Sequence, residues 1–463
     1  MEEQIMFDKP NIGILGLGHV GLPTALGLAD IGWNVIGADD MGSKAQDIAA
    51  GNAPFYEPGL SEMLTKNINS GRFSVATSVE EAIDASDVIF VCVGTPQNDD
   101  GSADLSQIES AGRTIAQNSN SNKLVVEKST TPVSTSLRIK DTLKKYAKKN
   151  VDFEVAVNPE FLREGTGLYD FFNPDRIVLG VESEAAKNTL LKIYLPLLEQ
   201  NLPEDISDQA IFNAHGNDKF VITDVNTAEL IKHASNSFLA TKISFINVVA
   251  DICEKSGSDV SKVAKGMGLD PRIGSSFLQA GLGFGGYCLP KDIKAFTRIG
   301  EDLGVDMSFF REVDNVNMKR VDQIMDKLRR KLWVLRDKTV AVWGIAFKPG
   351  TDDIRESPAI ALIEKLIEEK VKLNLHDPKA IEEFKKTSLS EYKNIEYFTG
   401  SVESSINADA IIIATDWPEF KSVDYKYIKD NMQYPFILDA RNLLNPDEMV
   451  DIGFDYIGVG RYS

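Results

Sequence analysis

Cysteine and histidine are both scarce in this chain, which has three cysteines and four histidines among its 463 residues. Cys92, Cys253 and Cys288 form neither an even set nor a CxxC pair, so the sequence predicts neither a disulfide framework nor a zinc site. The histidines are scattered without the spacing of metal ligands, and we therefore expect no bound metal. This cysteine usage favours a reducing, cytoplasmic environment.

Long apolar runs and an excess of basic residues are missing as well. No stretch approaches the length of a membrane span, and the first residues lack the apolar segment behind a basic start that is typical of a secretion signal. The 50 lysines and arginines are outnumbered by 69 aspartates and glutamates, which gives a formal net charge of -19. This charge argues against non-specific binding to nucleic acid or anionic membranes, although local amides and a few cations can still bind a phosphorylated small ligand.

A nucleotide-binding pattern opens the chain, between residues 11 and 40. An apolar run is followed by a glycine turn, a helical segment and a second apolar run, which ends at Asp39. Gly16, Gly18 and Gly21 fit the G-x-G-x-x-G fingerprint of dinucleotide-binding folds. In this pattern the carboxylate binds the ribose hydroxyls and would repel a 2′-phosphate, so the sequence predicts NAD rather than NADP.

Further strand-like runs alternate with amphipathic segments through the N-terminal half. With 463 residues, 43% of them apolar, the chain is long enough for two or three such domains. The alternation indicates an α/β fold with a parallel, doubly wound sheet. Cys92 lies in one of these runs, and we interpret it as a core residue. The predicted strands are residues 88–93, 124–126, 155–157 and 177–181.

Polar residues follow three of these predicted strands. Thr95, Thr130 and the pair Glu160 and Glu164 come directly after apolar runs. Ligands of open α/β sheets lie at the carboxyl ends of the strands, so these side chains are candidate ligands. The alternatives are turn or cap positions for the threonines and a solvated face for the two acids.

A segment of about 30 residues without glycine or proline, residues 224–254, predicts one long helix. At 1.5 Å per residue it would measure about 45 Å, more than one small domain requires, so we expect it to join two domains and to form a subunit interface. Lys232 and Asn236 are four residues apart and share one face. Lys232 taken alone is interpreted as an ordinary surface lysine, and His233 is interpreted as structural.

The stretch from residue 281 to 292 places Cys288 behind four glycines within six residues and just before Pro290. Proline suits the first position of a helix, so we expect a helix from Pro290 with Cys288 at its N-terminus. There the helix dipole favours the nucleophilic thiolate, and Asp292 lies within reach for proton transfer. The alternative is a buried cysteine that acts as a small apolar residue.

The C-terminal third repeats the order of strand, glycine turn, helix and strand from Thr339 onward, without a G-x-G-x-x-G pattern. Ser357 and Pro358 mark the start of its first helix. Lys348, Arg355 and Arg441 supply positive charge in an acidic chain. They suit a second phosphorylated ligand, with ordinary surface ion pairs as the alternative.

At this point the sequence resembles the UDP-glucose/GDP-mannose dehydrogenase family over essentially its whole length. The resemblance rests on a series of ordered motifs. They are GLGHVG, FYEPGL, EKST, NPEFLREG, the Lys232–Asn236 pair, DPRIG, GFGGYCLPKD, GIAFKPGTDDIRESP and DARNLL.

The resemblance implies three domains: an NAD-binding Rossmann domain at 1–210, a central helical dimerisation domain at 211–330, and a Rossmann-like nucleotide-sugar domain at 331–463. It also implies a homodimer built on the long helix and an oxidation of a UDP-sugar, UDP-glucose, by two NAD and water. Another nucleotide sugar, GDP-mannose or a UDP-N-acetylhexosamine, is the alternative, and a non-catalytic NAD and nucleotide-sugar binding protein is a further one.

The resemblance also implies the roles of individual residues. Cys288 would form a thiohemiacetal and then a thioester, Lys232 and Asn236 would stabilise the oxyanion, and Glu160 would activate the hydrolytic water. Asp292 would assist proton transfer through water or hold the lysine, and either Lys232 or a water held by Asp292 would take the first proton. The other implied catalytic residue is Thr130. The implied cofactor residues are Gly16, Gly18, Val20, Gly21, Asp39, Thr95, Thr130, Glu164 and Arg355. The implied substrate residues are Phe161, Leu162, Arg163, Lys232, Asn236, Arg272, Phe277, Leu278, Gly285, Phe347, Lys348 and Arg441.

Three further details of the resemblance concern the surroundings of the sugar. The glycines before Cys288 would leave room for a hexose to approach the thiol, and Arg272 would reach into the site of the neighbouring subunit. Tyr287 departs from the family pattern, since many relatives have serine there. This difference concerns the choice of sugar rather than the chemistry.

Overall fold

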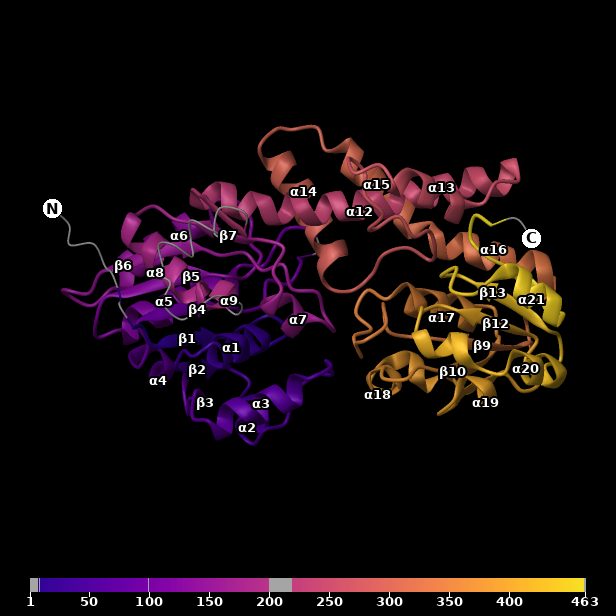
Figure 1. Ribbon diagram of the computed structural model, residues 1–463, viewed down its shortest axis with the longest axis horizontal. Helices are drawn as coiled ribbons and strands as arrows, with labels where there is room; N and C mark the ends of the chain where they lie inside the picture. The colour runs from indigo at the N-terminus through magenta and orange to yellow at the C-terminus, as the bar shows by residue number, and fades with distance from the viewer. Residues whose placement is uncertain (1–6, 8, 99, 200–218, 462–463) are drawn as a thin grey trace. The chain divides into compact units, whose positions relative to one another are not determined.

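The computed structural model describes residues 7, 9–98, 100–199 and 219–461 (Figure 1). The chain divides into two compact units, Met1–Ala234 and Ser235–Ser463. The division falls within the long helix α12 (Val225–Ser256). Of the two predicted domain boundaries, the one between residues 210 and 211 lies outside the described residues, and the one at 330 falls inside helix α16 (Arg320–Leu332). The three-domain division stays a prediction.

The N-terminal unit contains an eight-stranded sheet in the order β3-β2-β1-β4-β5-β6-β7-β8. The first six positions have the strand order of a Rossmann fold, with β1 at the centre. The pair β6–β7 is antiparallel, whereas the other neighbours are parallel. Alternation of strands and helices cannot reveal the direction of such an added strand, so the prediction of a parallel sheet was wrong for this pair. The strands are β1 (Ile12–Leu15), β2 (Val35–Ala38), β3 (Phe73–Val75), β4 (Val88–Val91), β5 (Lys123–Glu127), β6 (Phe153–Val157), β7 (Ile177–Gly180) and β8 (Phe220–Thr223).

Helices cover both faces of this sheet, as the predicted doubly wound fold requires. Successive residues of β1 point to opposite faces, so that Ile14 and Leu15 belong to two separate hydrophobic cores. Helices α1, α3, α7 and α8 contribute to the core of Ile14, and helices α4, α5 and α6 to that of Leu15. The helices are α1 (Gly21–Asp30), α2 (Gly42–Ala49), α3 (Leu60–Asn69), α4 (Val79–Asp84), α5 (Ser106–Asn118), α6 (Thr135–Tyr146), α7 (Gly167–Phe172), α8 (Glu184–Tyr194) and α9 (Pro196–Glu199).

The second unit contains a six-stranded parallel sheet in the equivalent order, β11-β10-β9-β12-β13-β14. Its central strand again alternates, with Val342 in one core and Trp343 in the other. The predicted repeat of a nucleotide-type α/β unit is therefore confirmed. The strands are β9 (Thr339–Trp343), β10 (Lys372–His376), β11 (Ile395–Tyr397), β12 (Ala410–Ile413), β13 (Phe436–Asp439) and β14 (Asp455–Ile457).

The first helix of this second sheet begins where the sequence indicates. Helix α17 starts at Pro358 with Ser357 as its N-cap, and the Ser357 hydroxyl accepts a hydrogen bond from the amide of Ala359. The other elements that flank this sheet are α18 (Ile381–Lys385), η2 (Ser388–Glu391), α19 (Ser401–Ser405), η3 (Pro418–Ser422), α20 (Tyr425–Asn431) and α21 (Pro446–Ile452).

Helix α12 has 32 residues and a length of about 48 Å, close to the prediction. Its C-terminal half packs with the helices that follow it in the chain, since Ile246 and Ala250 share a core with Ile324 and Leu328 of α16. In the described part of the chain, none of the helices combines the length and apolar character needed to cross a membrane. The following helices of this region are α13 (Val260–Gly268), α14 (Cys288–Asp302) and α15 (Ser308–Met318).

Candidate active site

The glycines after β1 form a turn in which Gly16 and Gly21 are crowded by neighbouring protein atoms, whereas Gly18 faces open space. Gly16 has a φ of 93°, and a Cβ there would lie 2.6 Å from the carbonyl oxygen of Cys92. A Cβ on Gly21 would lie 1.8 Å from the carbonyl oxygen of Gly16, so helix α1 packs directly on the turn. A Cβ on Gly18 would meet nothing within 4 Å, and Val20 precedes the first helical residue without a side-chain cap. A helix N-terminus behind such an open glycine suits a pyrophosphate.

Asp39 follows β2 and holds the same turn in place. Its Oδ2 atom accepts hydrogen bonds from the amide of Leu17 and from Lys44 Nζ, both at 2.8 Å. Burial opposes the charge of Asp39, but these bonds and that from the amide of Met41 outweigh it and hold the pKa of Asp39 below its ordinary value. Sequence reasoning missed Lys44, because no motif marks a lysine five residues after the acid.

The predicted ligands at the strand ends lie on neighbouring strands of the first sheet. Thr95 follows β4 and Thr130 follows β5, and the Thr95 hydroxyl donates a hydrogen bond of 2.9 Å to the carbonyl oxygen of Thr130. Glu160 follows β6, the next strand of the sheet, and Glu164 lies four residues further on. The sheet order thus brings three separate motifs to one edge, as the strand-end rule predicts.

Glu160 and Lys232 form a buried ion pair within the N-terminal unit. Lys232 Nζ donates to Glu160 Oε1 at 2.8 Å, and their side chains are 5% and 4% exposed. The amide of Leu162 donates a further bond of 2.6 Å to Glu160 Oε2. The Phe161 ring lies 3.7 Å from the Arg176 guanidinium and 5.4 Å from Lys232 Nζ. The surface alternatives for Lys232 and Glu160 are therefore wrong.

A second buried lysine, Lys128, lies close to this pair. Its Nζ donates a bond of 3.0 Å to Asn158 Oδ1, which also accepts from the Tyr194 hydroxyl. Burial lowers the pKa of Lys128, and the neighbouring Cys92 and Glu160 oppose this effect in part. Burial also raises the pKa of the Cys92 thiol to about 12, which agrees with its interpretation as a core residue. The sequence marked Lys128 only as part of the EKST motif.

The helix that carries Cys288 begins two residues earlier than expected. Cys288 is the first residue of α14, its N-cap is Tyr287, and Pro290 stands at the third position. Pro290 is tolerated there because the amides of the first turn have no partner within the helix. The thiol therefore lies at the helix N-terminus, where the dipole favours a thiolate. The Cys288 side chain is partly exposed, unlike that of a core cysteine.

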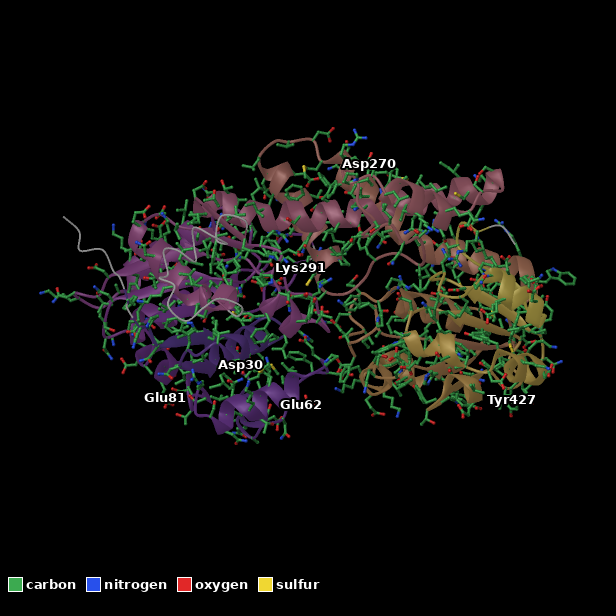
Figure 2. All side chains as sticks on the ribbon, viewed as in Figure 1. Asp30, Glu62, Glu81, Asp270, Lys291 and Tyr427 are labelled. Atoms are coloured by element: carbon green, nitrogen blue, oxygen red, sulfur yellow. The ribbon has the colours of Figure 1, made fainter. Side chains whose placement is uncertain are left out.

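Asp292 lies one turn after Cys288 and is almost fully buried. Asn236 Nδ2 donates a bond of 2.6 Å to its Oδ2 atom, and Lys291 Nζ lies 2.9 Å from its Oδ1 atom. Lys291 (labelled in Figure 2) is itself buried. Asn236 of α12 and Asp292 of α14 are thus in direct contact, a pairing that the sequence did not predict.

The glycines before Cys288 are required by contacts inside the protein. A Cβ on Gly285 would lie 2.3 Å from the carbonyl oxygen of Glu356, and one on Gly286 would lie 2.6 Å from the Phe347 ring. A Cβ on Gly281 would lie 2.6 Å from the carbonyl oxygen of Ala440. The expectation that these glycines make room for a sugar is therefore corrected, because loops of the second sheet already fill that space.

Arg441 ties this glycine loop to the second sheet. Its Nε donates to the carbonyl oxygen of Ala414 at 2.8 Å, and its Nη1 donates to that of Gly283 at 2.9 Å. Its Nη2 donates to the carbonyl oxygen of Phe347 at 3.4 Å. Burial lowers the pKa of Arg441. Lys348 Nζ lies 5.4 Å from the centre of the neighbouring Phe347 ring.

Arg355 and Tyr287 are in contact. The Arg355 guanidinium lies 4.5 Å from the centre of the Tyr287 ring and forms an ion pair of 2.7 Å with Asp353. Lys291 Nζ lies 5.6 Å from the same ring. Tyr287, the residue that departs from the family pattern, thus has two cationic side chains close to its ring.

The remaining predicted substrate residues are more scattered. Arg163 pairs with Asp170 across 2.5 Å. The Arg272 side chain is 87% exposed and pairs with Asp270. Phe277 has a φ of 64°, and Leu278 is buried in the core that α12 shares with α16.

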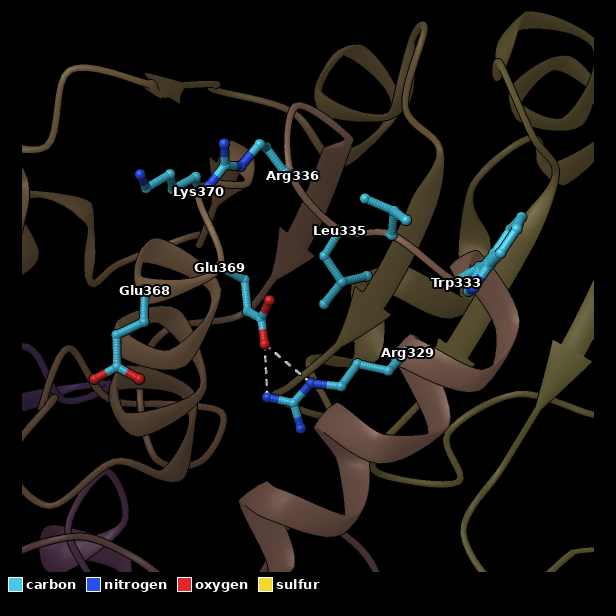
Figure 3. A pocket seen from close by; sticks show the side chains of 8 residues that line it. Arg329, Trp333, Leu335, Arg336, Glu368, Glu369 and Lys370 are labelled. Carbon is cyan, nitrogen blue, oxygen red and sulfur yellow. Dashed lines mark hydrogen bonds and ion pairs between the residues drawn. The ribbon is translucent and has the colours of Figure 1, made fainter.

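A separate pocket of about 360 Å³ lies between the end of α16 and the end of α17 (Figure 3). It contains the Arg329–Glu369 ion pair, and Trp333 at its edge is almost fully exposed. None of the predicted site residues lines it. The lining residues are Arg329, Trp333, Val334, Leu335, Arg336, Glu368, Glu369 and Lys370.

Comparison with known proteins decides the family. The three models that describe the NAD binding domain, the central domain and the UDP binding domain of the UDP-glucose/GDP-mannose dehydrogenase family match residues 10–198, 226–319 and 341–446. The chain belongs to this family. Like its relatives, it is an NAD-dependent nucleotide-sugar dehydrogenase.

Individual dehydrogenases of the family match over nearly the full length. UDP-glucose 6-dehydrogenase YwqF of Bacillus subtilis (strain 168) is 40% identical over 97% of this chain and 98% of its own. UDP-glucose 6-dehydrogenase of Rickettsia conorii is 40% identical over 97% of this chain and 99% of its own. The solved structure of a UDP-glucose dehydrogenase from Pyrobaculum islandicum has a TM-score of 0.87 and 37% identity, and covers 100% of this chain and 99% of its own.

Proposed function

We propose that the protein oxidises the 6-hydroxyl of UDP-glucose to a carboxylate, using two NAD and one water per sugar. The main support is the identity of about 40% with UDP-glucose 6-dehydrogenases along almost the whole chain. The observation that carries the proposal is Cys288 at the start of α14, with the buried Asp292 one turn later bonded to Asn236. An oxidation that stops at the aldehyde requires no thiol, whereas one that continues to the acid requires a tetrahedral adduct of the aldehyde.

The proposed role of Cys288 follows from this requirement. Its thiolate adds to the aldehyde carbon, which forms a carbon–sulfur bond and an oxyanion that takes up a proton. Oxidation of this thiohemiacetal at the same carbon leaves a thioester on Cys288. Water then adds to the thioester and the carbon–sulfur bond breaks, so that the carboxylate is released and the thiol is restored.

Lys232 and Asn236 are proposed to donate hydrogen bonds to the oxygen of the adduct. They are four residues apart in the sequence of α12, a spacing that places two side chains on one face of a helix. Asp292 fixes the Asn236 amide through its 2.6 Å bond and is proposed to hold a water for proton transfer. Glu160 is proposed to take a proton from the hydrolytic water, and Thr130 to position that water. The Lys232–Glu160 ion pair keeps both groups ordered.

The residues at the glycine turn of the first unit fit the cofactor. Gly18 presents an open backbone and Asp39 a carboxylate with a lowered pKa, as the pyrophosphate and the ribose hydroxyls of NAD require. Bound NAD accepts a hydride in each oxidation. Thr95, Thr130, Glu164 and Arg355 are proposed to complete this binding site.

The second unit is proposed to bind the UDP-sugar. Arg441, Phe347 and Lys348 lie at the carboxyl ends of its strands or in the loops after them, where ligands of α/β sheets bind. Arg441 already holds the glycine loop and Phe347 together, so the ligand would meet an ordered surface. Arg163, Phe161, Leu162, Phe277, Leu278 and Gly285 are the other proposed contacts, and Arg272 is proposed to act in the neighbouring subunit.

We also infer a homodimer built on α12. Three large apolar side chains at intervals of seven residues, Phe238, Phe245 and Ile252, are 64%, 49% and 59% exposed, and Val248 between them is 42% exposed. A stripe with this spacing is typical of a helix that packs against another helix. Its place on the long helix supports a second copy of the chain as the partner.

Oxidation of another nucleotide sugar, GDP-mannose or a UDP-N-acetylhexosamine, is the second candidate function. It is supported by the UDP-D-ManNAc dehydrogenase structure from Pyrococcus horikoshii, which has a TM-score of 0.81 and 28% identity. A panel of UDP-glucose, GDP-mannose and UDP-N-acetylhexosamines, each assayed for NADH formation, separates the two. We expect UDP-glucose to give two NADH per sugar. Turnover of another sugar without turnover of UDP-glucose would contradict the substrate, one NADH would contradict the thioester route, and none would indicate a binding protein.

A further inference from the structure

The loop before Cys288 has no regular secondary structure, yet side chains from other elements bind its backbone. The amide of Gly281 donates to Asn247 Oδ1 at 2.9 Å, and its carbonyl oxygen accepts from Arg320 Nε at 3.3 Å. The carbonyl oxygen of Gly283 accepts from Arg441. Buried backbone groups outside helices and sheets require such partners, and here they come from three different elements.

Asn317 of α15 makes the most complete of these contacts. Its Oδ1 atom accepts a bond of 2.8 Å from the amide of Phe284, and its Nδ2 atom donates a bond of 2.9 Å to the carbonyl oxygen of the same residue. The amide group of asparagine has one acceptor and two donors, so it matches a peptide unit as a carboxylate cannot. Gly283 makes the contact possible, because a Cβ there would lie 2.5 Å from Asn317 Oδ1.

The Phe284 side chain connects this contact to the two helices that bear the proposed catalytic groups. It is 5% exposed and shares one small core with Ala240 of α12, Ile293 of α14 and Val313 of α15. Ala240 lies one turn after Asn236, and Ile293 directly follows Asp292. The ring of Phe284 therefore packs between the helix of Asn236 and the helix of Cys288.

From these contacts we infer that Asn317 is a positioning residue of the reaction, acting through Phe284 on the relative placement of Cys288 and Asn236. This inference rests on the proposed function, because it presumes that Cys288 forms the adduct with the aldehyde. If the backbone of Phe284 is released, the thiol moves relative to the donor of its oxyanion. Adduct formation then slows, whereas formation of the aldehyde, which needs no thiol, does not.

Asn317→Asp tests the inference, since it keeps the size of the side chain but replaces the donor to the Phe284 carbonyl oxygen by a second acceptor. Asn315→Asp is the matched control: it lies on the same helix, is exposed, and its amide contacts only the side chain of Glu312 among the described contacts. The measurements are kcat, KM for NAD and for UDP-glucose, NADH per sugar, and trapping of released aldehyde with hydroxylamine.

For Asn317→Asp we expect kcat to fall by about tenfold, with both KM values changed by less than about threefold, as for a displaced reacting group. Hydroxylamine should trap aldehyde, so that NADH per sugar falls below two. Asn315→Asp should match the wild type. A general loss of structure would instead change KM and melting temperature without releasing aldehyde.

Phe284→Leu provides a second test if Asn317→Asp does not fold, because it keeps the backbone contact and alters only the ring between the helices. It should also release aldehyde. Wild-type kcat with no trapped aldehyde in a folded Asn317→Asp or Phe284→Leu protein would overturn the inference. Cys288→Ser distinguishes failure of the proposed function from failure of the positioning role. If Cys288→Ser turns over normally, the proposed function is wrong. If Cys288→Ser is inactive while Asn317→Asp behaves as the wild type, only the positioning role of Asn317 is refuted.

Discussion

Asn236 of α12 donates a hydrogen bond of 2.6 Å to Asp292 of α14, one turn after Cys288. The contact joins residues 56 positions apart in the chain and leaves both side chains at least nine-tenths buried. Lys291 neutralises the other oxygen of the same carboxylate. The Asp292 carboxyl group is therefore held in place through both oxygens, close to the N-terminus of the helix that carries the thiol.

Asp292→Asn should lower kcat by about 10²-fold or more, because it removes the buried charge that pairs with Lys291 and the carboxylate proposed to hold the water for proton transfer. Asp302→Asn, at the exposed end of the same helix, is the control and should leave kcat within about twofold of the wild type. Steady-state kinetics with UDP-glucose and NAD measure the effect. Equal activities of the two variants would contradict a role for Asp292.

Glu160→Gln should slow the release of product from the thioester more than the two oxidations, because Glu160 is proposed to activate the hydrolytic water. We expect a burst of NADH followed by steady turnover that is about 10²-fold slower than in the wild type. Stopped-flow absorbance at the NADH band measures both phases. Glu154→Gln, on the same strand β6, should show no burst, and a Glu160→Gln enzyme without a burst would contradict the assignment.

The buried acids Glu127 and Glu229 predict a pH dependence of stability. Burial raises the pKa of both carboxyls. The neighbouring Glu229 raises the pKa of Glu127 further. At Glu229, hydrogen bonds from the amides of Ser134 and Ser136 oppose the rise in pKa. In the unfolded chain these carboxyls ionise above their ordinary pKa of about 4.5, whereas in the fold they retain a proton to higher pH.

At these two sites the folded state thus binds more protons than the unfolded state over that range, and their contribution to the free energy of unfolding falls as the pH rises above about 4.5. Glu127→Gln should reduce this fall, so that its stability relative to the wild type improves between pH 5 and pH 8. Urea unfolding at several pH values tests this, with the exposed Glu80→Gln as control. An unchanged difference between variant and wild type across that range would refute the prediction.

Phe245→Glu should dissociate the proposed dimer, because it places a charge in the centre of the apolar stripe on α12. Lys255→Glu, an exposed site on the same helix outside the stripe, introduces the same side chain as a control. Sedimentation velocity should give a dimer for the wild type and for Lys255→Glu, and a monomer for Phe245→Glu. A wild-type monomer at micromolar concentration would contradict the dimer.

Much of this architecture could be predicted from local sequence. The turn at Gly16 and the long helix α12 follow from residue pattern, and the start of α17 at Pro358 follows from its cap. Such features depend on the conformational preferences of a few neighbouring residues. The antiparallel strand β7 could not be predicted, because direction depends on the path of the connection rather than on the strand itself.

The contacts that organise the candidate site were harder to find. Lys44 and Asn317 carry no motif, and their partners Asp39 and Phe284 are determined by tertiary packing. The glycines before Cys288 were recognised but misinterpreted, since the groups that exclude a Cβ there come from helix α15 and from loops of the second sheet, between 34 and 159 residues away. Sequence indicates that such positions are restricted, and the fold shows by which atoms.

Replacement of the thiol tests the central claim most directly. Wild-type enzyme should form two NADH for each UDP-glucose consumed. Cys288→Ser should nearly abolish this complete turnover, while binding of NAD and UDP-glucose, measured by calorimetry, stays within about threefold of the wild type. A Cys288→Ser enzyme that forms two NADH per sugar at the wild-type rate would contradict the thioester route.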